Sequence, residues 1–151
     1  MATVTASIGL NSRDISDNGL NISKAATLTQ AGVNTGVTGA LGISNRTLSA
    51  AQFRTLIDYS TEDVTGNAAK LYIKNTSSST VQYVSVHIGE QQAGSDTNLN
   101  TADDTVTADS EIARLYGGDW MFIPYTGGNT ADIVVKPSTA DEVTLEYMVI
   151  Y

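Results

Sequence analysis

The C-terminal third of the chain alternates between hydrophobic and polar positions in short runs. These runs cover residues 111–115, 120–125, 132–136 and 143–151, and Gly, Pro, Asn and Asp residues separate them. Period-two alternation bounded by turn formers is typical of β-strands. Short strands at intervals of about 10–15 residues with little helix point to an antiparallel sandwich or jelly roll.

Two alternating runs in the middle of the chain predict a β-hairpin. Leu71 and Ile73 alternate with polar or amphipathic residues, and Val84 and Val86 do so again further on. The segment 75–80 between the runs reads Asn-Thr-Ser-Ser-Ser-Thr and is rich in turn formers. We therefore expect the two runs to pair with each other.

Residues 48–59 fit two interpretations. Ser49 and Gln52 have the spacing of a capping box that opens a short helix. Phe53, Thr55 and Ile57 instead alternate with polar residues, as in a strand. We favour a strand, or a short helical turn that leads into one.

The first 45 residues differ from the rest in being poor in large apolar side chains. Asp17-Asn18-Gly19 is a strong turn signal between extended runs. Glycines recur every three or four residues within 31–42, which disfavours a helix. We expect residues 1–45 to form an extended N-terminal arm that packs on a neighbour, with an ordinary irregular loop as the alternative, and residues 46–151 to form a β-sandwich domain. The positions expected at subunit interfaces are Thr3, Val4, Ile8, Leu10, Leu28, Val33, Val37 and Leu41.

Composition narrows the classes of function. The chain has 151 residues, enough to bury roughly 70% of its unfolded surface as one domain. Its net charge is −8, and its eight Lys and Arg residues are scattered, which argues against binding to nucleic acid or to an anionic membrane. We expect no signal peptide and no membrane span. The absence of cysteine excludes disulfides, zinc-thiolate sites and a thiol nucleophile.

Candidate catalytic groups are few. His87 is the single histidine and lies on the polar side of its predicted strand, near Ser85. No nucleophile-elbow motif accompanies it, so we interpret it as an exposed or interface residue. Glycoside hydrolysis would need two carboxylates at a defined separation, which a sequence cannot show. We interpret the candidate carboxylates instead as acidic residues at turns and strand ends. These carboxylates are Asp119, Asp132, Glu142 and Glu146.

An acidic loop is the best candidate for a metal site. Asp96, Asn98 and Asn100 follow the oxygen-ligand spacing of a calcium loop, and Asp103 follows soon after. The turn glycine and the bidentate glutamate of an EF-hand are missing. We treat the loop as a weak calcium candidate, with a solvated loop tip as the alternative.

The aromatic residues fit a core better than a ligand surface. Trp120 and the tyrosines offer stacking surfaces for a sugar. However, Trp120, Phe122 and Pro124 are alternate apolar residues of one predicted strand, which is typical of a face that packs in the core. We expect Trp120 and Phe122, with Tyr147 and Val149 of the last run, to lie in the core.

Four motifs follow one another in residues 65–151. They are YIKN at 72–75, VSVHIG at 84–89, GDWMFIP at 118–124 and LEY at 145–147. In this order they resemble small virion structural proteins of tailed bacteriophages. The first 60 residues carry no diagnostic motif.

The resemblance implies a non-enzymatic capsid decoration or cement protein that binds the major capsid protein lattice or other virion proteins. It also implies a homo-oligomer, with a trimer favoured, made in the bacterial cytoplasm and located in the virion, and we expect no cofactor. Two alternatives stay open. One is a tail, neck or fibre component that touches the host surface, and the other is a carbohydrate- or calcium-binding β-sandwich module.

Overall fold

A computed structural model describes residues 3–14, 19–28, 37, 39–40, 42–58, 60, 68–106, 110–126 and 132–151. This described part contains strands and no helix. The chain divides into two compact units, Met1–Gly39 and Ala40–Tyr151. The predicted division at residue 45 lies a few residues further along, just after the start of the first strand of the second unit.

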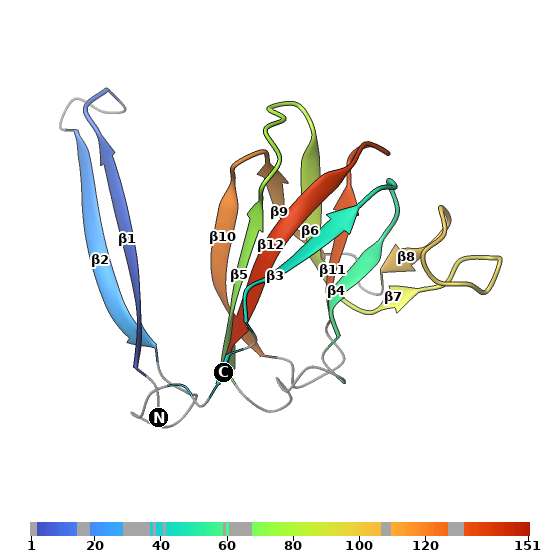
Figure 1. Ribbon diagram of the computed structural model, residues 1–151, viewed down its shortest axis with the longest axis horizontal. Helices are drawn as coiled ribbons and strands as arrows, with labels where there is room; N and C mark the ends of the chain where they lie inside the picture. The colour runs from blue at the N-terminus through green and yellow to red at the C-terminus, as the bar shows by residue number, and fades with distance from the viewer. Residues whose placement is uncertain are drawn as a thin grey trace. The chain divides into compact units, whose positions relative to one another are not determined.

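The first unit contains an antiparallel hairpin of two nine-residue strands. β1 (Val4–Ser12) pairs with β2 (Leu20–Leu28) along its full length, from Val4 opposite Leu28 to Ser12 opposite Leu20 (Figure 1). Gly19 has a positive φ of 65° just before β2, which fits the turn signal in the sequence. The predicted arm is therefore a two-stranded ribbon over its described residues. Most of the Gly-rich segment 31–42 lies outside the described residues.

The second unit is an antiparallel β-sandwich, which confirms the predicted fold class. One sheet has the order β10-β5-β12-β3 and the other the order β4-β11-β6-β9 (Figure 1). A small two-stranded sheet, β7 with β8, lies in the acidic loop. The bounds are β3 Ser44–Leu48, β4 Arg54–Ile57, β5 Ala68–Asn75, β6 Tyr83–Ile88, β7 Gln91–Gln92, β8 Thr105–Val106, β9 Ser110–Tyr116, β10 Trp120–Thr126, β11 Ile133–Pro137 and β12 Val143–Ile150.

The core lies between the two four-stranded sheets. Alternate residues of β5, β6 and β12 point inward, which confirms the period-two pattern of these runs. β11 is buried on both faces, in line with its continuous run of β-branched residues. The side chains at 0% exposure in this core include Leu71, Ile73, Val84, Val86, Ile133, Val135, Leu145 and Val149.

The predicted hairpin between residues 71 and 88 is wrong. β5 pairs with β10 and β12, whereas β6 pairs with β11 and β9, so the two strands lie in different sheets. The connection from β5 to β6 crosses between the sheets, and hydrogen bonds to strands of both sheets fix its course. The backbone N–H of Thr76 donates to the carbonyl oxygen of Thr144 in β12, and the side chain of Asn75 donates to the carbonyl oxygen of Leu115 in β9. Turn-rich composition predicted a reversal of the chain correctly but not the sheet that receives the next strand.

The placement of Trp120 in the core is also wrong, since its side chain is 52% exposed. Both sets of alternating positions in β10 are apolar, and the sequence does not show which set faces inward. The structure turns Met121, Ile123 and Tyr125 toward the core and leaves Trp120 on the outer side. Phe122 is half-buried. The expectation is correct for Val149, which is fully buried, and for Tyr147, which packs against the core.

The ambiguous segment 48–59 resolves as a strand. β4 covers Arg54–Ile57, and residues 50–52 form a bend before it. Leu56 and Ile57 are both buried. The strand interpretation is therefore correct.

Candidate functional site

The acidic loop after β7 brings three carboxylates together. One oxygen each of Asp96, Asp103 and Asp104 lies within 4.8 Å of the other two. Asp103 accepts hydrogen bonds from the backbone N–H and the hydroxyl of Ser95, both at 2.7 Å. A side chain at position 94 would collide with Asp103, so Gly94 gives this carboxylate its place.

The hydroxyl of Thr101 lies at the centre of this cluster. Its Oγ1 is 2.9 Å from an oxygen of Asp103, 2.9 Å from one of Asp104 and 3.4 Å from one of Asp96. The carbonyl oxygen of Asn98 is 3.3 Å away. A hydroxyl has one hydrogen to donate, so four neighbouring oxygens compete for it. Oxygen-rich geometry of this kind suits a hard cation such as Ca²⁺.

Asp104 is the buried member of the cluster. Burial by itself raises the pKa of this carboxyl, but four hydrogen bonds outweigh that effect and lower the pKa to about 2. The donors are the side chain of Gln91 at 2.7 Å, the backbone and hydroxyl of Thr101 at 3.1 and 2.9 Å, and the backbone of Asn100. The pKa of Asp103 is also lowered, mainly by the hydroxyls of Ser95 and Thr101.

Only two of the four predicted metal ligands belong to this cluster. Asp96 and Asp103 do, whereas the amide of Asn98 donates to the backbone of Asp96 and the side-chain oxygen of Asn100 faces Gln91. Both Thr97 and Asn100 have positive φ angles, 61° and 73°, which bend the loop away from regular spacing. Asp104 was not among the predicted ligands, and its one signal in the sequence is its position next to Asp103.

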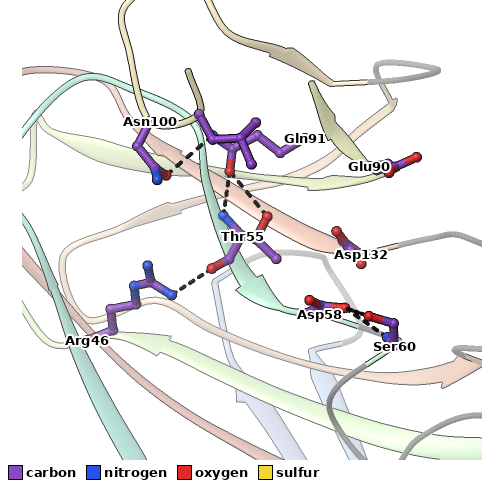
Figure 2. A pocket seen from close by; sticks show the side chains of 9 residues that line it. Arg46, Thr55, Asp58, Ser60, Glu90, Gln91, Asn100 and Asp132 are labelled. Carbon is purple, nitrogen blue, oxygen red and sulfur yellow. Dashed lines mark hydrogen bonds between the residues drawn. The ribbon is translucent and has the colours of Figure 1, made fainter. Parts of the chain in front are cut away.

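A shallow pocket of about 370 Å³ lies beside this loop (Figure 2). Gln91 lies along one side of the pocket. Its side-chain oxygen accepts a hydrogen bond from the backbone N–H of Thr55 at 2.9 Å, which fixes its position. Arg46 donates to the carbonyl oxygen of Thr55 at 2.6 Å from another side. The carboxylates of Asp58, Glu90 and Asp132 line the rest, so acids outnumber the single cation.

Besides burial, two carboxylates of the pocket contribute to a raised pKa of Tyr125. Burial, together with the negative charges of Asp132 and Asp58, raises the pKa of Tyr125 to about 12. This phenol therefore stays protonated throughout the physiological range. Asp58 and Glu90 were not among the predicted site residues, because nothing in the sequence marks them as neighbours of Asp132.

His87 is buried, at 4% exposure, which corrects the expectation of an exposed residue. Its ring meets Phe53 edge to face at 5.2 Å, and its Nε2 lies 2.8 Å from the hydroxyl oxygen of Ser85. That hydroxyl donates to the carbonyl oxygen of Lys136 at 3.1 Å. Since Ser85 uses its one hydrogen there, His87 is the donor to Ser85. A general base would have to accept the serine proton, so this pair has the opposite polarity to an activated nucleophile.

The four carboxylates considered for glycoside hydrolysis lie in different parts of the second unit. Asp119 accepts from the backbone N–H of Tyr116 in the turn between β9 and β10. Glu146 accepts from the hydroxyl of Tyr72 at 3.0 Å, on the outer side of its sheet. Glu142 is exposed just before β12, and Asp132 lines the pocket.

The outer side of the sheet β10-β5-β12-β3 carries an exposed aromatic residue. Trp120 lies opposite Lys74, and Lys74 lies opposite Glu146 on the next strand. One row along, Phe122 lies opposite Tyr72. The face therefore combines aromatic surface with two cations, Lys70 and Lys74, and one carboxylate.

The residues predicted for subunit contact differ in exposure. Thr3, Ile8 and Leu10 are exposed, Val4 is half-buried, and Leu28 and Val37 are buried. Val33 and Leu41 lie outside the described residues. Among the described positions, the accessible contact residues are therefore Thr3 and the β1 residues Ile8 and Leu10.

Comparisons with known proteins do not identify the chain. No family model, no curated protein and no solved structure matches it. Among the described residues, no helix is long and apolar enough to cross a membrane.

Proposed function

We propose that this chain is a non-enzymatic virion structural protein, a capsid decoration or cement protein that binds the major capsid protein lattice of a phage head. The observation that carries the proposal is the β1–β2 hairpin, whose two strands pair within the described residues only with each other. Each strand thus keeps one outer edge of backbone N–H and C=O groups. The motifs of residues 65–151 are the reason for assigning the protein to a virion.

The open edges of the hairpin are suited to strand addition. A neighbouring subunit that offers a sheet edge gains main-chain hydrogen bonds along nine residues, without any need for a catalytic group. We further propose a jelly-roll arrangement, because eight strands form two four-stranded sheets with β12 between β5 and β3. The protein acts without a cofactor, as a homo-oligomer with a trimer favoured, in a virion assembled in the bacterial cytoplasm.

Counting the protein in purified particles tests this proposal. A decoration protein is present in hundreds of copies per particle, and cryo-electron microscopy density places it on the outer surface of the head. A count of three to a few dozen would instead support the alternative of a tail, neck or fibre component. Absence from particles would overturn both virion roles.

Carbohydrate binding is a second candidate function, favoured by the exposure of Trp120. Tyr72, Lys74 and Glu146 on the same side of the sheet supply hydrogen-bonding groups around the indole ring. Because Trp120 is the single tryptophan, its fluorescence reports binding directly. Titration of the wild type with bacterial surface polysaccharide should shift the emission. The two variants lack the fluorophore, so calorimetry measures their affinity: Trp120→Phe should retain part of it, and Trp120→Ala should lose about ten-fold or more. An unchanged spectrum would remove this candidate.

Calcium binding stays a prediction, because hydrogen bonds within the loop satisfy much of the oxygen cluster without an ion. If the loop binds Ca²⁺, millimolar Ca²⁺ should raise the melting temperature of the wild-type chain. It should not change the melting temperature of a double variant that carries Asp96→Ala and Asp103→Ala. Equal melting curves with Ca²⁺ and with a chelator would rule out the site.

A further inference from the structure

The β1–β2 hairpin has one apolar and one polar face. The register places Leu10 opposite Ile22 and Ile8 opposite Lys24, and alternate residues along each strand share a face. One face carries Val4, Ala6, Ile8, Leu10, Leu20, Ile22, Ala26 and Leu28, together with Ser12 and Lys24. The other face carries Thr5, Ser7, Gly9, Asn11, Asn21, Ser23, Ala25 and Thr27. The separation is nearly complete over both nine-residue strands.

The middle of the apolar face is open to solvent. Ile8, Leu10 and Ile22 are 42%, 45% and 39% exposed. A two-stranded ribbon has little stability of its own in water, and a contiguous apolar surface on it is typical of a contact site. The face therefore requires a partner that covers Ile8, Leu10 and Ile22.

The distribution of charge favours an uncharged partner surface. The first unit contains Arg13 and Lys24 against Asp14 and Asp17, so it is formally neutral. The whole net charge of −8 therefore lies on Ala40–Tyr151. On the apolar face the one charged side chain is Lys24, in the middle row beside Ile8, and its ammonium group can extend past the outer edge of β2 to solvent. An uncharged partner face suits the rest of the surface.

Along the strands of the apolar face, a row of small side chains and a row of large ones lie on opposite sides of the middle row, so two copies of the face can fit each other. Ala6 pairs with Ala26 in the second row, and Leu10 pairs with Ile22 in the fourth of five rows. A two-fold rotation that packs two hairpins face to face with antiparallel strands brings the second row of one onto the fourth row of the other. Small side chains then receive large ones, as a packed interface requires. The rotation also brings the middle row onto itself, so the two Lys24 side chains lie next to each other and must direct their ammonium groups outward to solvent.

We propose that the apolar face of the β1–β2 hairpin binds the same face of a second copy of this chain, in an antiparallel two-fold contact centred on Ile8. The inference rests on the contact role that the proposed function gives to the hairpin, but it uses the face rather than the open strand edges. The edges thereby stay available for a shell protein.

The size of the face sets the strength of this contact. Nine residues per strand and two strands give a footprint of at most roughly 30 by 10 Å, or about 600 Å² over both copies, since Leu28 at one end is already buried within the chain. Stable interfaces bury about 1,200–2,000 Å², so an isolated pair is weak and depends on concentration. On a particle, repetition of the contact would strengthen it through avidity.

Sedimentation of the full chain over a range of concentrations tests the contact. The variant Leu10→Asp with Ile22→Asp should lose this pairwise contact, with two-fold association at least ten-fold weaker. The control Asn11→Asp with Asn21→Asp adds the same two charges to the adjacent row on the polar face and should associate like the wild type at high salt. Salt should strengthen wild-type association, because it screens repulsion between the acidic second units. A wild-type chain that is monomeric at every concentration, or equal effects of the two variants, would overturn the proposal.

A cross-linking measurement keeps the test valid if the aspartate variant loses its hairpin. The chain has no cysteine, so a single introduced thiol reports on one position. The two-fold places residue 8 next to its counterpart, so Ile8→Cys should form a disulfide-linked dimer with diamide several-fold faster than Ser7→Cys on the polar face. Equal rates would contradict the two-fold contact. Particle binding is measured separately, so its loss would count against the virion role and not against this contact.

Discussion

At the scale of single residues, Asp104 is the most constrained ionisable group of the acidic loop. Its carboxylate is buried, and all four of its hydrogen-bond partners are donors. One of them, Gln91, also bonds to Thr55 of β4 and so ties the loop to the sandwich. The charge of Asp104 thus organises the loop through these hydrogen bonds, which the adjacent Asp103 and Asp104 in the sequence do not reveal.

Replacement of Asp104 by Asn should destabilise the second unit by roughly 2 kcal/mol at pH 7, because the neutral amide lacks the negative charge that these donors stabilise. The folded pKa of about 2 lies below the ordinary value, so the ionised carboxylate stabilises the fold above about pH 4. This contribution is lost as the pH falls from about 4 to about 2. Urea unfolding at several pH values measures the difference between wild type and variant, which should shrink over that window.

The matched control is Asp96→Asn in the same loop. Asp96 is exposed and accepts from the backbone N–H of Asn98, a bond that an asparagine oxygen can also accept. Its effect should stay within about 0.5 kcal/mol. An equal loss for both variants at pH 7 would contradict the special role of Asp104.

At the scale of elements, two connections between the sheets hold each other in place. The backbone N–H of Gly117, in the turn from β9 to β10, donates to the carbonyl oxygen of Ser79 at 2.9 Å, and that of Gly118 donates to the carbonyl oxygen of Asn75 at 2.9 Å. Asn75 and Ser79 belong to the crossing from β5 to β6. The two crossings are therefore packed backbone to backbone, which explains why β5 does not form a hairpin with β6.

Gly117→Ala should destabilise the second unit by about 1–3 kcal/mol. The added methyl group would lie 2.6 Å from the carbonyl oxygen of Ser77 and closer still to that of Ser79, so backbone has to move. Denaturant unfolding measures the loss. Gly42→Ala is the control, since nothing lies within 4 Å of a methyl group there and its effect should be small. Wild-type stability of Gly117→Ala would show that the crossings adjust freely.

At the scale of the whole molecule, the chain joins two units of different character. The first is a neutral ribbon with exposed apolar residues, and the second is an acidic sandwich with a continuous core. Backbone hydrogen bonds of a two-stranded sheet are easily opened, whereas those of a packed sandwich open only with the core. The two units should therefore differ in resistance to proteases.

Brief trypsin treatment of the full chain should cut first after Arg13 and Lys24, both exposed in the first unit. The remaining basic residues lie in strands of the sandwich, where cleavage should be slower: Arg46, Arg54, Lys70, Lys74, Arg114 and Lys136. Mass spectrometry of the early fragments identifies the order. The variant Arg13→Gln with Lys24→Gln should delay the first cut, and first cuts within the sandwich would contradict this division.

Because period-two alternation and turn formers are local properties, the sequence by itself determined the all-β class and the positions of most strands in the second unit, though not of β3, β7 or β8. It also pointed to the turn at Asp17-Asn18-Gly19 between two extended runs. The contact role of Ile8 and Leu10 stays a prediction. Only the tertiary structure decided that β5 and β6 lie in different sheets and that Trp120 is exposed. It likewise brought Asp104 next to Asp96 and Asp103. Sheet partners, the inward face of a strand with two apolar faces, and convergence of loop side chains all depend on contacts between distant residues, which local pattern does not encode.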